Sequence, residues 1–345
     1  MLTHSRRWGV ATALLLTASG PRLLAGPSRP GPRPAPPPVR LKTAIPTPSG
    51  MDLLGKSHWA RRHVPFEGRE MSVTWTDRRS ISAVSKRCRF GSRERSEYLV
   101  PAGLRGQIYL RDDAWTRIYS PRARRVDVTP SVETAEFDLP LVMRNYRIRV
   151  DPQLQKVAGR SCRSLRLQPI DTGKPYRVLC LDSATFLVLK LERFHPDGSP
   201  AALTQFTEIR IGRPPDPSTF TLKLPPGVKE VRRVTRGNVA IHPGVAKKLP
   251  AGYLLKSCTG ASVNDGWHCV YSDGVDMVSV FAARGSSAKI APGEPLRIGR
   301  YAGTVNRRRR QWILSWISRG ERVTIVGDLS RDRIIDLARA VAGST

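Results

Sequence analysis

The residue types that most often carry out chemistry are present in this 345-residue chain, but their spacing does not suit a reaction. Six histidines are scattered along it, and His58 with His63 lacks the i, i+4 spacing of a metal-binding pair on a helix. Asp112 and Asp113 fit a hairpin turn better than an acid–base pair, because nothing near them in the sequence would separate their pKa values. The sequence has no G-x-S-x-G segment and no glycine-rich phosphate loop. We therefore expect no enzymatic activity, no metal and no cofactor.

The five cysteines indicate disulfide chemistry instead. Cys162 and Cys180 flank a predicted turn, so in an antiparallel hairpin they would lie opposite each other. Cys258 and Cys269 flank a second turn in the same way. The sequence predicts two cross-strand disulfides, which form in an oxidising compartment; five unrelated thiols are the alternative. The spacings lack the C-x-x-C pairs of zinc modules, and Cys88 has no predicted partner.

The first 25 residues are predicted to be a signal peptide. Arg6 and Arg7 precede an apolar run from Trp8 to Ala18, and Leu23-Leu24-Ala25-Gly26 offers small residues near a plausible cleavage point, with Thr17-Ala18-Ser19 as a competing site. This order is typical of a cleaved secretory signal, and the run is too short to span a bilayer comfortably. A short buried helix is the alternative interpretation. The sequence therefore predicts an exported protein.

The charge of the chain is strongly positive. The 58 Lys and Arg residues against 28 Asp and Glu give a net charge of +30, which attracts polyanions. Nucleic acid is not an expected partner, because the protein is predicted to be exported and no helix-turn-helix, stacking motif or zinc finger is found. Nine basic residues are candidates for contacts with a protein partner or an anionic headgroup, with a solvated loop as the alternative. They are Arg232, Arg233, Arg236, Lys247, Lys248, Arg307, Arg308, Arg309 and Arg310.

The hydrophobic pattern predicts an α+β protein with one large, strongly curved antiparallel sheet, followed by a second, smaller domain. The predicted parts are a Pro-rich basic tether at residues 26–49, a first domain at 50–224, a linker at 225–248 and a second domain at 249–345. In the first domain, helices are predicted at residues 52–62 and 138–147, and strands at 70–76, 79–88, 97–100, 107–111, 114–119, 124–128, 157–168, 176–182, 186–194 and 204–211.

The second domain is predicted to contain the Cys258 hairpin, a strand at residues 277–282, a hairpin at 311–317 and 321–326, and a final helix. Ser330 or Asp328 can cap this helix, and Asp332 favours its positive end. Its apolar residues recur with a helical period. They are Ile334, Ile335, Leu337, Ala338 and Val341.

A series of short motifs runs through both domains in a distinctive order. The motifs of the first domain are Phe66-Glu67-Gly68, Tyr109-Leu110-Arg111-Asp112 followed by Trp115, Val157-Ala158-Gly159-Arg160 and Gln205-Phe206-Thr207-Glu208-Ile209. The motifs of the second domain are Pro250-Ala251-Gly252-Tyr253, Val270-Tyr271-Ser272-Asp273-Gly274, Val278-Ser279-Val280-Phe281 and Val323-Thr324-Ile325-Val326-Gly327-Asp328. Their order resembles the MucB/RseB family, whose larger domain resembles the lipoprotein carriers LolA and LolB. The resemblance covers residues 55–342.

This resemblance implies a half-open β-barrel over helices, joined to a smaller α/β domain, in the periplasm. It also implies a regulator that clamps the exported part of a membrane anti-sigma factor until lipid or lipopolysaccharide competes, and so controls an envelope stress response. The strong basicity departs from the family and leaves the nature of the partner open. A lipid or lipoprotein carrier of the LolA/LolB type is the alternative function, although the second domain favours the regulator. Self-association into a homo-oligomer is left open.

A curved sheet that does not close leaves an apolar trough, which can hold an acyl chain or an apolar stretch of peptide. Six residues on the predicted strands are candidates for its lining, and ordinary core packing is the alternative for each. They are Tyr109, Trp115, Tyr119, Phe186, Leu187 and Phe206.

Overall fold

The structure is a computed structural model, and it describes residues 49–76, 79–131, 137–172, 177–232, 245–260, 266–283, 290, 292–308 and 311–344. The predicted signal peptide and almost all of the predicted tether lie outside these residues. Residues Thr47–Thr345 form one compact unit, which contains two β-sheets. Within the described ranges, no helix is long and apolar enough to cross a membrane.

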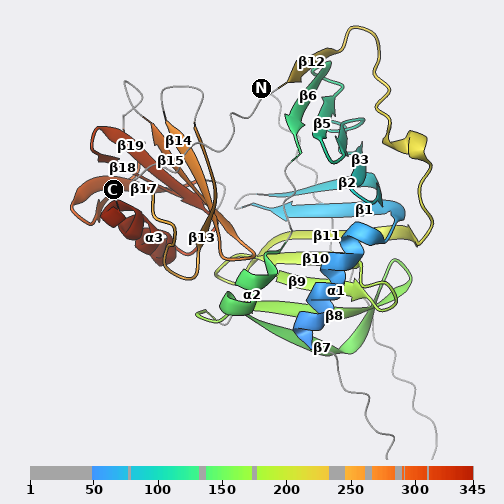
Figure 1. Ribbon diagram of the computed structural model, residues 1–345, viewed down its shortest axis with the longest axis horizontal. Coiled ribbons are helices and arrows are strands. Elements are labelled where there is room, and N and C mark those ends of the chain that lie inside the picture. The colour runs from blue at the N-terminus through green and yellow to red at the C-terminus, as the bar shows by residue number, and fades with distance from the viewer. Residues whose placement is uncertain are drawn as a thin grey trace, which may run out of the picture. The chain divides into compact units, whose positions relative to one another are not determined.

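Twelve strands form the larger sheet, in the order β12-β6-β5-β4-β3-β2-β1-β11-β10-β9-β8-β7 (Figure 1). Neighbouring strands are antiparallel except β12 and β6, which are parallel. The strands are β1 (Phe66–Trp75), β2 (Ser80–Phe90), β3 (Arg93–Val100), β4 (Ile108–Arg111), β5 (Trp115–Ser120), β6 (Arg125–Pro130), β7 (Tyr146–Val157), β8 (Arg160–Pro169), β9 (Arg177–Asp182), β10 (Val188–Phe194), β11 (Pro200–Ile211) and β12 (Lys229–Arg232). The end strands β12 and β7 do not pair with each other, so the predicted large, unclosed sheet is confirmed.

The edge strand β7 was not predicted, and it corrects the expected strand at residues 157–168. Val157 ends β7 and Arg160 begins β8, and the turn between them has positive φ at Ala158 and Gly159. Such a two-residue turn suits the twist of a hairpin. Pro152 lies within a register shift of β7, where an edge strand tolerates proline. A second correction concerns the expected linker, because β12 within it joins the larger sheet.

Helix α1 (Gly50–His63) lies across strands β7 to β11 in Figure 1. Ser49 caps it, since its hydroxyl accepts a hydrogen bond from the backbone N–H of Asp52. Leu53 and Leu54 are buried and pack into one apolar cluster with leucines of β8 and β9. Both α1 and α2 (Leu139–Asn145) were predicted, although α2 ends two residues earlier than expected because β7 begins at Tyr146.

One face of the sheet carries helix α1 and is called the α1 face below. Directly opposed residues of antiparallel strands point to the same face. Phe66 opposes Arg89, Arg89 opposes Glu94, and Glu94 opposes Arg111. Phe66 also packs in a cluster with Ala60 of α1, so all four strand residues belong to the α1 face.

On strands β4 to β6 the apolar residues lie on the opposite side, called the outer face below. They form a buried cluster that is covered by three residues from later in the chain. Phe220 is the last residue of the 3-10 helix η1 (Pro217–Phe220), and Leu222 and Val228 lie in the segment after it. The buried members are Ile108, Leu110, Tyr119, Val126 and Val128. The sheet therefore buries one face along β7 to β11 and the other along β4 to β6.

The smaller sheet has seven antiparallel strands in the order β13-β14-β15-β19-β18-β17-β16. Helix α3 (Arg331–Ser344) packs against it through the predicted apolar residues, and the backbone N–H of Arg333 donates to the Ser330 hydroxyl at its start. The strands are β13 (Leu254–Gly260), β14 (Trp267–Ser272), β15 (Met277–Ala283), β16 (Glu294–Ile298), β17 (Tyr301–Arg308), β18 (Gln311–Ser318) and β19 (Glu321–Gly327). Strands β16 and β17 were not predicted.

The motif Ser272-Asp273-Gly274 contacts helix α2. Asn145 donates from its side-chain amide to the backbone carbonyl of Asp273 at 2.7 Å, and the Tyr146 hydroxyl donates to the Asp273 carboxylate at 2.8 Å. Gly274 has a φ of 108°, and a Cβ there would stand 2.7 Å from the backbone N of Val142. Only glycine permits this approach. Burial raises the pKa of Asp273, and the nearby carboxylate of Asp276 adds to the effect.

Candidate binding cavity beneath helix α1

A cavity of about 450 Å³ lies on the α1 face, between helix α1 and the central strands β1, β2, β10 and β11. Its volume falls within the usual range for small-molecule pockets. Ser57, His58 and Arg61 line it from α1, and Met277 lines it from β15. The four strands are paired on both sides, so most of their backbone groups are used within the sheet and the side chains largely decide what the cavity can hold.

One end of the cavity is apolar. Phe66 and Phe206 meet edge to face, with ring centroids 5.4 Å apart. Leu187, Leu189 and Leu191 complete this end from β10 and the turn before it. Packed aromatic and aliphatic walls of this kind accept an apolar chain.

The other end, toward β2, is lined by Glu70, Arg87 and Arg89. Together with Glu94 and Arg111, which contact them without lining the cavity, these residues are called the arginine cluster below. Arg87 donates to Glu70 at 2.6 Å and to Glu94 at 2.7 Å and 3.0 Å. Arg89 and Arg111 approach the second Glu94 oxygen at 3.8 Å and 3.5 Å. Three guanidinium groups thus share two carboxylates, and one positive charge is in excess.

Burial makes this excess charge costly. Arg89 is 4% exposed and Glu94 is 6% exposed. Burial opposes ionisation of Glu94, but the charges of Arg87 and Arg89 outweigh it and lower the pKa of Glu94 to about 2. Burial also lowers the pKa of Arg89 to about 10, and the charges of Arg61, Arg111 and Arg87 act in the same direction. The Glu94 carboxylate only partly offsets them, so Arg89 is under-compensated.

Of the six candidates for the trough, Leu187 and Phe206 line this cavity. Phe186 packs between the apolar clusters on the α1 face, under the Lys56 ammonium at 4.9 Å from its ring centroid. Tyr109 opposes Ile118 on the α1 face and lies two residues before Arg111 of the arginine cluster on β4. Trp115 and Tyr119 lie on the outer face.

Trp115 and Tyr119 share the outer face because Tyr119 opposes Ile108 and Val126 across its two neighbouring strands. Both belong to the cluster covered by the segment after η1. The structure therefore separates the six candidates into two groups on opposite faces of the sheet, because the buried face changes between β11 and β4.

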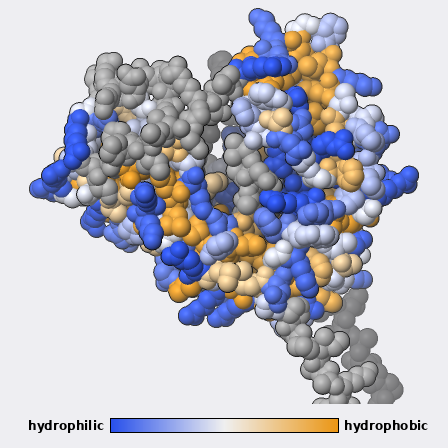
Figure 2. Space-filling model, viewed as in Figure 1, coloured by the Kyte–Doolittle hydropathy of each residue, from blue (hydrophilic) through white to orange (hydrophobic). Residues whose placement is uncertain are grey.

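The nine basic candidates do not form one described site. Arg232 ends β12, pairs with Glu230 and stacks over the Trp115 ring, while Arg307 stacks over Trp312. The others described, Lys247, Lys248 and Arg308, are exposed. Hydrophilic residues are scattered over the visible face in Figure 2. Arg233, Arg236, Arg309 and Arg310 lie outside the described residues.

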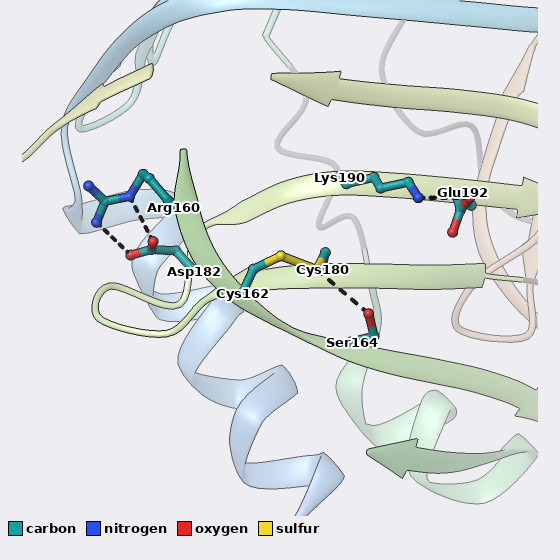
Figure 3. Close-up of a disulfide and its surroundings, with 7 residues drawn as sticks. All are labelled: Arg160, Cys162, Ser164, Cys180, Asp182, Lys190 and Glu192. Carbon is teal, nitrogen blue, oxygen red and sulfur yellow. Dashed lines mark hydrogen bonds and ion pairs between the residues drawn. A yellow bond between two sulfur atoms is a disulfide. The ribbon is translucent and has the colours of Figure 1, made fainter. Parts of the chain in front are cut away.

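Both predicted disulfides are present, but the first is offset. Cys258 directly opposes Cys269 on β13 and β14, as expected. Cys162 instead opposes Asp182, and Cys180 opposes Ser164, so Cys162 and Cys180 are diagonal neighbours with Cα atoms 5.5 Å apart (Figure 3). Two residues of offset keep both side chains on one face, and the bridge still forms.

The carboxylate of Asp182 fixes the turn that follows strand β9. This buried carboxylate accepts two hydrogen bonds from Arg160, at 2.7 Å and 3.0 Å (Figure 3). It also accepts from the backbone N–H and hydroxyl of Thr185 in the turn that presents Phe186 and Leu187. Burial opposes ionisation, but these bonds lower the pKa of Asp182. A fixed carboxylate therefore positions the turn at the apolar end of the cavity.

The residues with a possible chemical role are engaged in local structure. The Asp112 carboxylate accepts from the backbone N–H groups of Ala114 and Trp115 and pairs with Arg117 at 2.7 Å, as a hairpin-turn residue does. His63 stacks on Trp59. Among the described residues, no group of three or more His, Cys, Asp or Glu side chains could hold a metal ion.

The arginine cluster was not predicted. Glu70, Arg87 and Arg111 lie on predicted strands, but Arg89 and Glu94 fall between the strands predicted at 79–88 and 97–100. Charged residues that alternate along a strand are also the pattern of an exposed strand face. The sequence carries no separate signal for burial at Arg87, Arg89 and Glu94. A usable hint was that Glu and Arg recur on three consecutive strands, which permits cross-strand pairs.

Comparisons with known proteins agree with this fold. Residues 60–224 match the family model of the MucB/RseB N-terminal domain. A chain of the Pseudomonas aeruginosa MucA/MucB complex is similar at 20% identity with a TM-score of 0.60, over 84% of this chain and 96% of that one.

The chain is also similar to MucB in complex with MucA(peri), at 20% identity and a TM-score of 0.60, over 84% of this chain and 97% of that one. MucB alone matches at 21% identity and a TM-score of 0.53, over 84% and 96%. No curated protein matches the sequence significantly. The predicted resemblance is therefore confirmed: residues 60–224 match the MucB/RseB N-terminal domain, and the chain has the fold of MucB.

Proposed function

We propose that this protein is an exported, non-enzymatic regulator that binds the periplasmic part of a membrane anti-sigma factor. The observation that carries the proposal is the similarity to MucB, which has been solved in complex with MucA(peri) and of which 97% is covered. The coverage includes the smaller sheet, which a simple carrier of the LolA type would not need. A first domain that runs through β12 and a second domain from residue 249 belong to the same proposal.

The second part of the proposal is that the cavity beneath α1 takes a lipid or the acyl part of a lipopolysaccharide, and that this ligand governs release of the anti-sigma factor in an envelope stress response. Support comes from the apolar end formed by Phe66, Leu187 and Phe206. A signal peptide at residues 1–25 and a periplasmic location complete the proposal.

A capture experiment tests the first part. The mature full-length chain is immobilised and incubated with a detergent extract of the cell envelope from its own organism, and bound proteins are identified by mass spectrometry. We expect recovery of a single-pass membrane protein with a cytoplasmic sigma-factor-binding segment. The control is the same chain unfolded in urea before immobilisation. Recovery of lipoproteins or free lipid alone would contradict the regulator and favour a carrier.

A further inference from the structure

The arginine cluster is a buried site with a net positive charge at the wall of a cavity. Arg87 and Arg89 both line the cavity, with Arg61 of α1 facing them. Arg89 is held by a 3.3 Å bond to the Gly91 carbonyl and by the 3.8 Å approach to Glu94. Arg89 is 4% exposed and has only these hydrogen-bond and ion-pair partners among the described residues, so its guanidinium group favours an added anion.

We propose that the arginine cluster is the seat for the anionic group of an amphiphile whose acyl chain lies at the apolar end of the cavity. This inference rests on the proposed lipid-binding function and gives the ligand its chemistry, a carboxylate or phosphate monoester at one end of an apolar chain. The charged end and the apolar end belong to one cavity. Glu70 of β1 directly opposes Phe206 of β11, and both line the cavity together with Thr204.

An acyl chain suits this cavity better than a peptide. A peptide brings backbone N–H and C=O groups that must find partners when they are buried. The cavity is walled by β1, β2, β10 and β11, which are all interior strands of the sheet, so most of their backbone groups are used in pairing, with a register shift between Val188 and Lys190 of β10. A hydrocarbon chain needs no such partners, and its anionic group offsets the positive charge in excess in the arginine cluster.

The test uses the mature full-length protein and isothermal titration calorimetry with monomeric oleate, oleyl phosphate and the neutral oleyl alcohol. We expect oleate or oleyl phosphate to bind at least about tenfold more tightly than oleyl alcohol, as one charge-assisted hydrogen bond implies. Arg89→Gln should remove most of that difference and leave oleyl alcohol binding unchanged. Glu70→Gln, which raises the excess charge, should tighten binding of the anion.

Opposite signs for these two variants are a result that mere structural damage would not produce. Arg210→Gln is the matched control, because Arg210 lies on β11 with a side chain 79% exposed and pairs only with Glu67 in the described structure. If Arg89→Gln does not fold, Arg111→Gln replaces it, since Arg111 contacts the same Glu94 oxygen. Circular dichroism checks the fold of each variant.

The outcomes separate this inference from the function on which it rests. Equal affinities for oleate and oleyl alcohol, with no effect of Arg89→Gln, would overturn the anion seat and leave the lipid cavity standing. Failure of all three amphiphiles to bind would overturn both. Inorganic phosphate binding as tightly as oleyl phosphate would show that the seat is not coupled to the apolar end. Displacement of oleate by a blocked Leu–Glu peptide of higher affinity would overturn the choice of an acyl chain.

Discussion

The two halves of the larger sheet bury opposite faces. Along β7 to β11 the apolar side chains, such as Leu165 and Leu179, point toward helices α1 and α2. Along β4 to β6 the apolar side chains point to the outer face, where Leu110 and Val128 are covered by the segment after η1. The α1 face therefore carries apolar side chains along β7 to β11 and charged side chains toward β4. The cavity lies where the two halves meet.

This comparison shows how one sheet can supply both the charged and the apolar wall of a cavity. Strands β1 and β2 lie between the halves, and both faces of β2 are partly buried, with Arg89 on one side and Cys88 on the other. The charged half supplies the arginine cluster, and the apolar half supplies Phe206 and Leu187. The change of buried face is therefore the feature on which the proposed ligand chemistry depends.

The largest expected effect is on Glu94, which holds the charged half together. Glu94→Ala leaves Arg87, Arg89 and Arg111 with one carboxylate, and breaking a buried ion pair from one side costs about 3–5 kcal/mol. Urea unfolding followed by tryptophan fluorescence gives the value. Glu97→Ala is the matched control on the outer face of the same strand, where its pair with Arg95 contributes at most about 1 kcal/mol. Equal small losses would contradict a buried cluster.

The outer face of β4 gives the next largest effect. Leu110 is 3% exposed, so Leu110→Ala should lower the free energy of unfolding by about 3 kcal/mol. Ile118→Ala, on the α1 face of the neighbouring strand, should cost about 1 kcal/mol because that side chain is only partly buried. Denaturant unfolding of both variants makes the comparison. A larger loss for Ile118→Ala would mean that the buried face does not change in this half.

The pH dependence of stability sharpens the account of the charged half. The pKa of Glu94 falls from 4.5 to about 2 on folding, so its contribution is present above pH 4.5 and is lost as the pH falls through that interval. Linkage gives a loss of about 2 kcal/mol between pH 5 and pH 3 from this group. The difference in unfolding free energy between the wild type and Glu94→Gln should shrink by that amount over the same range. A constant difference would place Glu94 outside the cluster.

The smallest effect concerns Cys88, on the outer face of β2. It is 2% exposed and burial raises the pKa of its thiol to about 11. Cys88→Ser places a hydroxyl in this position and should cost about 1 kcal/mol, because the hydroxyl loses water. Ser82→Ala, at an exposed position of the same strand, should be neutral within about 0.5 kcal/mol. A neutral Cys88→Ser would show that the outer face is open to solvent at β2.

Much of the fold could be predicted because strands and turns leave local signals. Ten strand-like runs between turn residues indicated the large sheet, and the apolar period of residues 334–341 indicated α3. Strand β7 was missed because Asp151-Pro152-Gln153 reads as a loop, whereas the structure accommodates it as a register shift in an edge strand. Strands β16 and β17 were missed because Pro295 and the Arg-rich end of β17 weaken the strand pattern.

The cavity was harder to predict than the fold. Alternation identifies two faces of a strand but not which face is buried, since that depends on what packs against it. Trp115 and Tyr119 were assigned to the same trough as Phe206 on the assumption of one buried face throughout. The segment that covers them, around Phe220 and Val228, lies about a hundred residues away in sequence. Long-range packing of this kind leaves no local pattern.

Hydrogen–deuterium exchange of the full-length protein, with and without saturating oleate, tests most directly that the α1 face at the junction of the two halves is the binding surface. We predict added protection in residues 57–61 of α1 and in β2 and β10, with none in β5 or β6. Protection confined to β5 and β6, around Trp115 and Tyr119, would place the ligand on the outer face and contradict the account.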